Sequence, residues 1–141
     1  MNRIYLDTSV FGGFFEPEFE IWTKILFEKI NSEVYSVIFS KLTEIELERA
    51  PLHVKTLALS IPQSQIEPVE IGDEALELAE IYLKEGVVGK TSKSDCIHIA
   101  LATISRADIL VSWNFKHIVN VHRIRGYNSV NYKLGYPILE I

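Results

Sequence analysis

Short runs of strand-forming residues alternate along this chain with stretches whose apolar residues recur at helical spacing. The strand-like runs lie at 4–6, 34–39, 66–69 and 109–111. The helical patterns lie at 20–31, 41–50, 72–86 and 95–105, and from 124 to 134. Such an alternation is typical of a parallel sheet covered by helices, so α/β is the expected fold class.

For three segments the sequence pattern leaves the type of element, or the residue at which it ends, undecided. The run 66–69 is either a short strand or only a connection. Pro51 either ends the helix before it or opens another helix after it. Gly135 is expected to end the last helix, and Pro137 to Ile141 then resembles a final strand.

Two helical patterns also predict which residues are buried. Over 20–31 the apolar stripe consists of Ile21, Ile25, Leu26 and Ile30. The pattern over 95–105 is apolar nearly all round, and Ser94 can cap its start. A helix with this pattern is expected at the centre of the fold.

A chain of 141 residues has the usual length of one domain, so we expect a single domain over 1–141. Its apolar runs are broken well before the ~18 residues that a membrane helix needs, and no signal segment opens it, which favours a cytoplasmic protein. The one cysteine, Cys96, excludes an internal disulfide and a thiolate zinc cluster. A net charge of −5 argues against general electrostatic adhesion to nucleic acid.

Positive charge is nevertheless concentrated in two places. No acidic residue lies between Lys116 and Lys133, and a second group of lysines precedes the helix at 95–105. Runs of this kind are usually solvated faces, but they are also where an RNA backbone would be contacted. The candidate RNA-binding residues are Lys90, Lys93, Lys116, Arg123 and Arg125.

Asp7 directly follows the first strand-like run, and two hydroxyl residues, Thr8 and Ser9, follow Asp7. One interpretation is a helix cap or turn, because Asp, Thr and Ser all bond to nearby backbone N–H groups. The other is a functional site, because in open α/β sheets the site forms beyond the carboxyl ends of the strands.

Glu46 is the carboxylate expected to face inward from the helix that follows the second strand. At ~100° per residue it points along the apolar stripe, whereas Glu44 and Glu48 point to the opposite side. A carboxylate on an apolar face is costly unless it is paired, hydrogen-bonded or bound to a cation. The alternative to a cation site is an ion pair with Arg49 or Arg3.

Asp95 and Asn114 add to this set of oxygen-bearing side chains. Asp95 opens the most buried helix, where the dipole favours an anion, and Asn114 follows the strand at 109–111 with Ser112 before it. Carboxylates that meet in one pocket repel each other unless a hard cation lies between them. Oxygen-only ligands suit Mg²⁺ or Mn²⁺, which also accept phosphate oxygens, so a phosphodiester substrate is expected.

Four stretches carry a family likeness, namely "YLDTSV", "SKLTEIELERA", "KSDCIHIALATISRADILVSWNFKHI" and "RIRGYNSVNYKLGY". Together they resemble the PIN domain, and in particular the VapC-type toxin ribonucleases and their prokaryotic relatives. The resemblance covers essentially the whole chain. It implies a three-layer α/β/α sandwich with a central, mainly parallel sheet, and a Mg²⁺- or Mn²⁺-dependent site that hydrolyses RNA phosphodiester bonds.

The resemblance also assigns roles to residues of this chain. Asp7, Glu46 and Asp95 match the metal-binding acids of the family by position, and Thr8 or Ser9 matches the hydroxyl that supports the first acid. It further implies an antitoxin protein as partner, a homodimer, and no membrane association.

Asn114 stands where many members of the family carry a fourth aspartate. Its amide oxygen can still coordinate a metal or hold a metal-bound water, so Asn114 stays in the candidate catalytic set, with Ser112 as a supporting residue. Because the amide supplies no charge, the alternative is a catalytically weak or degenerate PIN module that binds RNA or a protein partner without cutting.

Other chemistry has little support in the sequence. His98 lies three residues after Asp95 on the same helix, but no further His or Cys completes a zinc set, so we interpret His98 as packed or outward. Trp113 and Phe115 either stack on bases or pack beside the core strand.

Overall fold

Four parallel strands form the centre of the computed structural model, which describes residues 1–88 and 93–141. The strands are β1 (Asn2–Leu6), β2 (Tyr35–Ser40), β3 (Ile66–Val69) and β4 (Ile109–Val111). They lie in the order β3-β2-β1-β4, and each neighbouring pair is parallel. The chain moves outward from β1 through β2 and β3 and then crosses to β4 on the other side of β1. Strand order therefore reverses between β1 and β4, the position where open α/β sheets form their sites.

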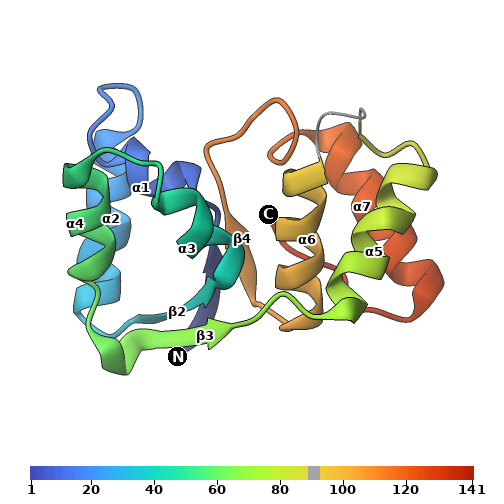
Figure 1. Cartoon of the computed structure of the whole chain (residues 1–141), viewed down its shortest axis with the longest axis horizontal. Coiled ribbons are helices and arrows are strands. Elements are labelled where there is room, and N and C mark those ends of the chain that lie inside the picture. Colours follow the sequence, from blue (N-terminus) through green and yellow to red (C-terminus); the bar gives the residue numbers. More distant parts are fainter. Residues whose placement is uncertain (89–92) are drawn as a thin grey trace.

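The first half of the chain covers one face of this sheet (Figure 1). Its helices are α1 (Ser9–Gly13), α2 (Glu20–Asn31), α3 (Lys41–Leu47) and α4 (Leu52–Leu59), and the short 3₁₀ helix η1 (Gln63–Gln65) precedes β3. Because successive side chains of a strand point to opposite faces, Ile4 and Leu6 of β1 pack into this layer while Tyr5 does not.

The opposite face is covered by the second half of the chain. Its helices are α5 (Asp73–Lys84), α6 (Lys93–Ile104) and α7 (Val121–Leu134). Tyr5 and Leu110 of the sheet pack into the core on this side. Helix α6 is buried nearly all round from Cys96 to Thr103, as its sequence predicts, and Cys96 packs there as a small apolar residue. The two helical layers and the sheet between them confirm the α/β/α sandwich.

The bounds predicted for α2 are confirmed, and two residues of its predicted stripe, Ile30 and Leu26, do pack into the core, whereas the other two do not. The buried residues of α2 are Thr23, Phe27 and Ile30. Ile21 and Ile25, which the stripe places inside, are 65% and 41% exposed. Phe27 packs edge-on against Phe11 of α1 at 6.0 Å between ring centroids, and this aromatic contact determines which face of α2 meets the sheet.

Both ambiguous connections resolve into regular structure. The run 66–69 is a strand, β3, at the edge of the sheet. The predicted helix 41–50 ends at Leu47, and Pro51 is the N-cap of α4, so a second helix does follow it. Pro is well suited to a helix start because it has no N–H to leave unsatisfied.

Two predicted helix and strand ends are wrong. Helix α6 already includes Lys93, so Ser94 lies inside its first turn and is not the cap. The segment 137–141 forms no strand. Its contact with β4 is a bond from Leu110 N to Glu140 O at 2.8 Å, while Asn128 of α7 binds both the N–H and the C=O of Leu139. That side chain takes the backbone groups that a strand would need for its ladder.

Gly135 ends α7 as predicted, with a φ of 83° in the left-handed region. An L-residue in this conformation brings Cβ against the neighbouring carbonyl, which costs roughly 1–2 kcal/mol. We expect Gly135→Ala to lower the free energy of unfolding by about 1 kcal/mol, as measured by urea denaturation. Gly72→Ala is the control, because Gly72 has a negative φ and open space where a Cβ would lie. Equal stability of the two variants would contradict this account of the cap.

Candidate active site

Asp7 leaves the carboxyl end of β1 and is only 5% exposed. Its backbone N–H donates to Val111 O at 3.0 Å, which ties it to the end of β4. Its Oδ2 accepts hydrogen bonds from Ser9 Oγ at 2.7 Å and Ser112 Oγ at 2.9 Å. Two hydroxyl groups, one after β1 and one after β4, therefore hold one carboxylate oxygen of Asp7 and set the direction of the other.

The hydroxyls after β1 do not cap the helix that follows them. Helix α1 has no side-chain hydrogen bond at its N-cap, Thr8. Instead Thr8 Oγ1 donates to Glu46 Oε1 at 2.9 Å, and Ser9 Oγ donates to Asp7. The interpretation of these residues as a simple cap is therefore wrong, because both hydroxyls are bonded to acids.

Glu46 is brought to the same place from β2 and α3. Ser40 Oγ accepts from Thr43 N at 3.1 Å and caps α3, whose turn then carries Glu46 toward Thr8 and His98. Burial raises the pKa of Glu46, but the hydrogen bond and charge of His98 and the bond from Thr8 outweigh it, so the net shift is downward. Glu46 is thus held as a carboxylate.

The neighbouring charges agree with the predicted direction of Glu46. Glu44 and Glu48, on the other side of α3, are exposed. Arg3, one of the two partners considered for Glu46, instead binds Glu67 at 2.8 Å. An ion pair with Arg3 therefore does not account for Glu46.

His98 is the site residue that the sequence did not reveal. It is 1% exposed on α6, so it is packed as expected, but its Nε2 contacts Glu46 Oε1 and lies 3.5 Å from Asp7 Oδ1. The available signal was a lone histidine on a helix that is otherwise apolar. Its meaning depended on which strand faces it, and that was not visible in the pattern.

Tyr5 orients the His98 ring from the interior. Burial raises the pKa of the Tyr5 phenol, so its hydroxyl keeps its proton and donates it to Ser40 Oγ at 2.8 Å. The same oxygen lies 2.7 Å from His98 Nδ1. The imidazole ring is therefore held between Tyr5 on one side and the carboxylates of Glu46 and Asp7, which Nε2 faces, on the other.

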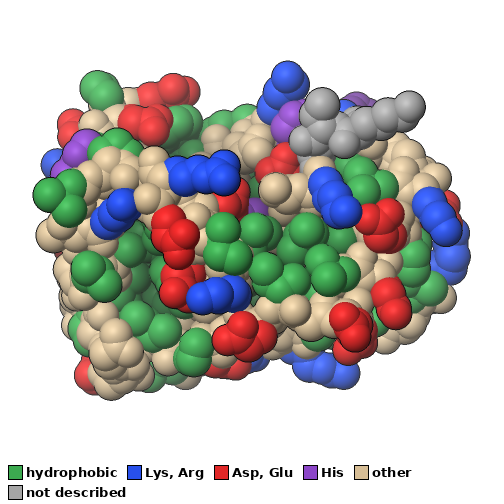
Figure 2. Space-filling view, in the orientation of Figure 1, with side chains coloured by type: hydrophobic (Ala, Val, Ile, Leu, Met, Phe, Trp, Pro, Cys, Tyr) green, Lys and Arg blue, Asp and Glu red, His purple; other side chains and the backbone are tan. Residues whose placement is uncertain are grey.

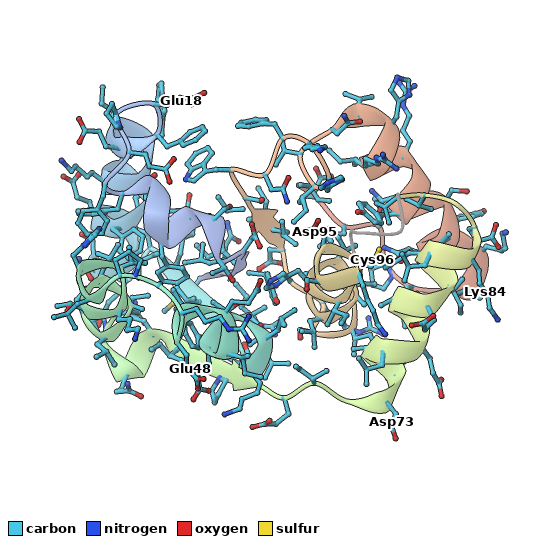
Figure 3. The ribbon with its side chains drawn as sticks, turned by 45° about the horizontal axis from the view of Figure 1, so that its top comes forward. Glu18, Glu48, Asp73, Lys84, Asp95 and Cys96 are labelled. Carbon is cyan, nitrogen blue, oxygen red and sulfur yellow. The ribbon has the colours of Figure 1, made fainter. Side chains whose placement is uncertain are left out.

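Asp95 lies in the first turn of α6, and Figure 3 shows it near β4 and far from Glu48. Asn114 Nδ2 donates to Asp95 Oδ1 at 3.2 Å, while Asn114 Oδ1 accepts from His117 N at 3.0 Å. Asn114 therefore presents a donor to Asp95 and uses its oxygen within its own loop. In this arrangement it positions the carboxylate and does not add an oxygen ligand beside it.

The pKa of Asp95 is raised. Burial is the largest cause and the charge of Asp7 the second, and Glu46 also contributes in this direction, while the charges of His117 and His98 oppose it. The three acids, which come from residues 7, 46 and 95, are thus close enough to disturb one another. This is the electrostatic situation that a bound cation relieves.

The kind of donor fits a hard divalent cation, because Asp7, Glu46 and Asp95 offer carboxylate oxygens. Within residues 1–88 and 93–141, however, no three His, Cys, Asp or Glu side chains are already grouped around one ion position. His98 holds the position between Asp7 and Glu46. A metal bound by the three acids would take the place of the contacts that His98 makes with Asp7 and Glu46.

The candidate RNA-binding residues are spread over several environments. Lys116 and Arg125 are exposed, whereas Arg123 is half-buried and donates to Val87 O. Lys93 forms a 3.3 Å ion pair with Glu80. Lys90 lies outside the described residues.

A profile of the PIN domain matches residues 4–116 of this sequence, a span that contains all three acids. The chain belongs to the PIN domain family. PIN domains are generally nucleases and usually use divalent metal ions. Among solved structures this PIN domain is similar to VapBC2 from Rickettsia felis bound to a DNA fragment from their promoter. The identity is 17% and the TM-score 0.54, over 82% of this chain and 92% of that chain, so the likeness supports the fold. No curated protein matches the sequence.

No helix among the described residues of this PIN domain is both long and apolar enough to cross a membrane.

Proposed function

We propose that this PIN domain is a Mg²⁺- or Mn²⁺-dependent endoribonuclease that hydrolyses RNA phosphodiester bonds. The observation that carries the proposal is the convergence of Asp7, Glu46 and Asp95 beyond the ends of β1 and β4. His98 contacts both Glu46 and Asp7, and burial together with the charges of Asp7 and Glu46 raises the pKa of Asp95. Carboxylates in this relation suit a divalent ion, and a divalent ion suits a phosphodiester. Family membership supports the same chemistry.

A divalent ion held by these acids supplies the positive charge that polarises a phosphoryl oxygen and activates water for attack. The remaining work falls to the protein. Ser9 and Ser112 hold one oxygen of Asp7 while the other lies 3.5 Å from His98 Nε2, and Thr8 holds one oxygen of Glu46. Asn114 orients Asp95 through its amide nitrogen. Such neighbours fix the ligands so that little reorganisation is needed when substrate binds.

Glu46→Gln is expected to lower kcat for RNA cleavage about 100-fold with Mg²⁺ or Mn²⁺, equivalent to roughly 3 kcal/mol of transition-state stabilisation. The matched control is Glu44→Gln, two residues away on the exposed side of α3, which is expected to retain full activity. The measurement is single-turnover cleavage of a labelled RNA pool. Equal rates for the two variants would contradict the metal-ligand role of Glu46.

A second candidate function rests on Asn114. Because it presents a donor to Asp95 and adds no charge, the site has fewer anionic ligands than a set with a fourth aspartate, which favours a weak or degenerate PIN module that binds RNA or a protein partner without cutting. Cleavage by the purified protein that disappears in the Glu46→Gln variant would exclude this alternative.

We further propose that the nuclease is the toxin of a toxin–antitoxin pair, that it acts in the cytoplasm, and that it forms a homodimer. The structural similarity to VapBC2 supports a protein partner. Co-expression with the product of a neighbouring small reading frame would test the partner: relief of growth inhibition is the expected result, and unchanged inhibition would argue against it.

A further inference from the structure

Three aromatic rings form a cluster beside the acids, and we call Phe19, Trp113 and Phe115 the aromatic cluster. Phe19 and Trp113 are stacked, with ring centroids 5.1 Å apart and planes inclined by 9°. Phe19 and Phe115 are also stacked, at 6.0 Å and 24°. The third pair, Trp113 and Phe115, is tilted by 32° with ring centroids 6.5 Å apart. Phe19 is therefore the ring on which both of the others stack.

Neighbouring residues hold the indole of Trp113 in one orientation. Its Nε1 donates to Thr23 Oγ1 at 3.0 Å, and Thr23 is fully buried. A Cβ placed on Gly13 would lie 2.5 Å from Trp113 Cδ1, so the ring lies directly on the backbone of α1. A fixed ring loses little conformational freedom when a ligand stacks on the cluster.

The aromatic cluster is connected to the acid site through the chain itself. Trp113 N donates to Ser9 Oγ at 3.0 Å, and the same oxygen donates to Asp7. The flanking residues Ser112 and Asn114 bind Asp7 and Asp95. One loop after β4 therefore positions two acids and two aromatic rings.

A cavity of about 260 Å³ joins the two features, because its wall includes Thr8 and Ser9 of the acid site and Phe19 and Trp113 of the aromatic cluster. Phe115, the third ring of the cluster, lies outside the wall of this cavity and is 51% exposed. An aromatic ring that is half in water gains little from packing alone, so packing explains Trp113 better than it explains Phe115.

Because the protein is negatively charged, a nucleic-acid ligand needs contacts other than neutralisation of its phosphates. The chain has a net charge of −5. On the face shown in Figure 2, Lys and Arg side chains are scattered among acidic ones and form no broad patch. A protein with this surface obtains little affinity from phosphate neutralisation, whereas stacking on an aromatic ring is independent of charge and accepts any base.

On the basis of the proposed ribonuclease function, we infer that the aromatic cluster is a stacking platform for an unpaired nucleobase of single-stranded RNA beside the scissile phosphate. The ring face of Phe115 receives the base, while Phe19 and Trp113 support it from behind. A duplex cannot supply this contact, because its bases are already stacked on each other. The site therefore selects single-stranded over double-stranded RNA.

The test uses the intrinsic fluorescence of Trp113. The chain has two tryptophans, so a Trp22→Phe background leaves Trp113 as the single reporter. In chelator, where no cleavage occurs, a mixed-sequence single-stranded RNA is expected to quench this fluorescence, whereas an abasic ribose-phosphate strand and a duplex are not. Quenching of equal size by the abasic strand would overturn the inference.

Phe115→Ala in the same background is expected to raise the Kd for single-stranded RNA about tenfold, and Phe115→Tyr to restore it. With Mg²⁺ or Mn²⁺ the alanine variant should raise KM and leave kcat nearly unchanged. The control is Tyr132→Ala, which removes an even more exposed ring, 78% exposed, on α7 and should leave the Kd unchanged.

The outcomes separate this inference from the proposed function. An unchanged Kd in Phe115→Ala, with cleavage intact, would overturn the platform and leave the ribonuclease standing. If the quenching depends on the base and is weaker in Phe115→Ala, the platform is supported. If the same protein cuts no RNA with Mg²⁺ or Mn²⁺, the ribonuclease function is overturned. The platform would also be overturned by a protein ligand whose binding requires Phe115 but is not displaced by RNA.

Discussion

Asp95→Asn is expected to lower RNA cleavage at least about 100-fold while it raises the melting temperature of the metal-free protein. The loss of activity follows because the variant removes one of the three anionic ligands that we propose for the metal. The gain in stability follows because burial and the charge of Asp7 raise the pKa of Asp95 in the folded state. An asparagine in its place still accepts the hydrogen bond from Asn114 but has no charge to bury.

The pH dependence of that gain follows from the direction of the shift. The folded protein binds the Asp95 proton more tightly than the unfolded chain does, so ionisation of Asp95 opposes folding once the pH rises above the ordinary range of an aspartate. The variant is therefore more stable than the wild type at neutral pH. Its advantage disappears at acidic pH, where the wild-type carboxyl is protonated in both states.

Thermal melts in chelator over a pH series, together with cleavage assays in Mg²⁺, would measure both effects. Asp73→Asn is the control, since Asp73 lies at the first turn of α5, far from Asp95 in Figure 3. It should cut normally and show no gain in melting temperature. An Asp95→Asn protein that cuts RNA at the wild-type rate would exclude Asp95 as a metal ligand.

The part of the site that lies at strand ends was predictable from the sequence. Asp7 and the loop from Ser112 to Asn114 each follow a short apolar run, and parallel strands bring their carboxyl ends to one edge. The direction of Glu46 followed from helical geometry on α3. These inferences need only local periodicity and the parallel arrangement.

The rest depended on contacts between elements far apart in the sequence. His98 became a site residue only because α6 packs over β1, which brings its ring to Tyr5 and Glu46. Helix α1 has five residues, too few to show a period, so it was not predicted. The α2 stripe was right for Ile30 and Leu26 but not for Ile21 and Ile25, because the buried face of the helix is centred on Thr23, Phe27 and Ile30.

The replacement His98→Gln is expected to lower the free energy of unfolding of the metal-free protein by about 3 kcal/mol, because it breaks the contacts that a buried ring makes with two carboxylates. His98 contacts the side chains of Asp7 and Glu46, which are 7% and 34% exposed. Glutamine keeps a hydrogen-bonding group but cannot reach Tyr5 and both carboxylates as the imidazole ring does. Urea denaturation in chelator measures the loss, and His122→Gln, on an exposed residue of α7, is the control.

The same variant tests whether a divalent ion and His98 balance the same carboxylates. If they do, Mg²⁺ or Mn²⁺ stabilises His98→Gln more than it stabilises the wild type, because in the variant no imidazole competes with the ion for these carboxylates. In the wild type the ion must first displace the contact between His98 and Glu46, so its net effect is smaller. Denaturation curves with and without metal for both proteins measure this difference directly. An identical metal-induced shift in both would show that the ion is bound where His98 has no influence, and the three-acid site would then be wrong.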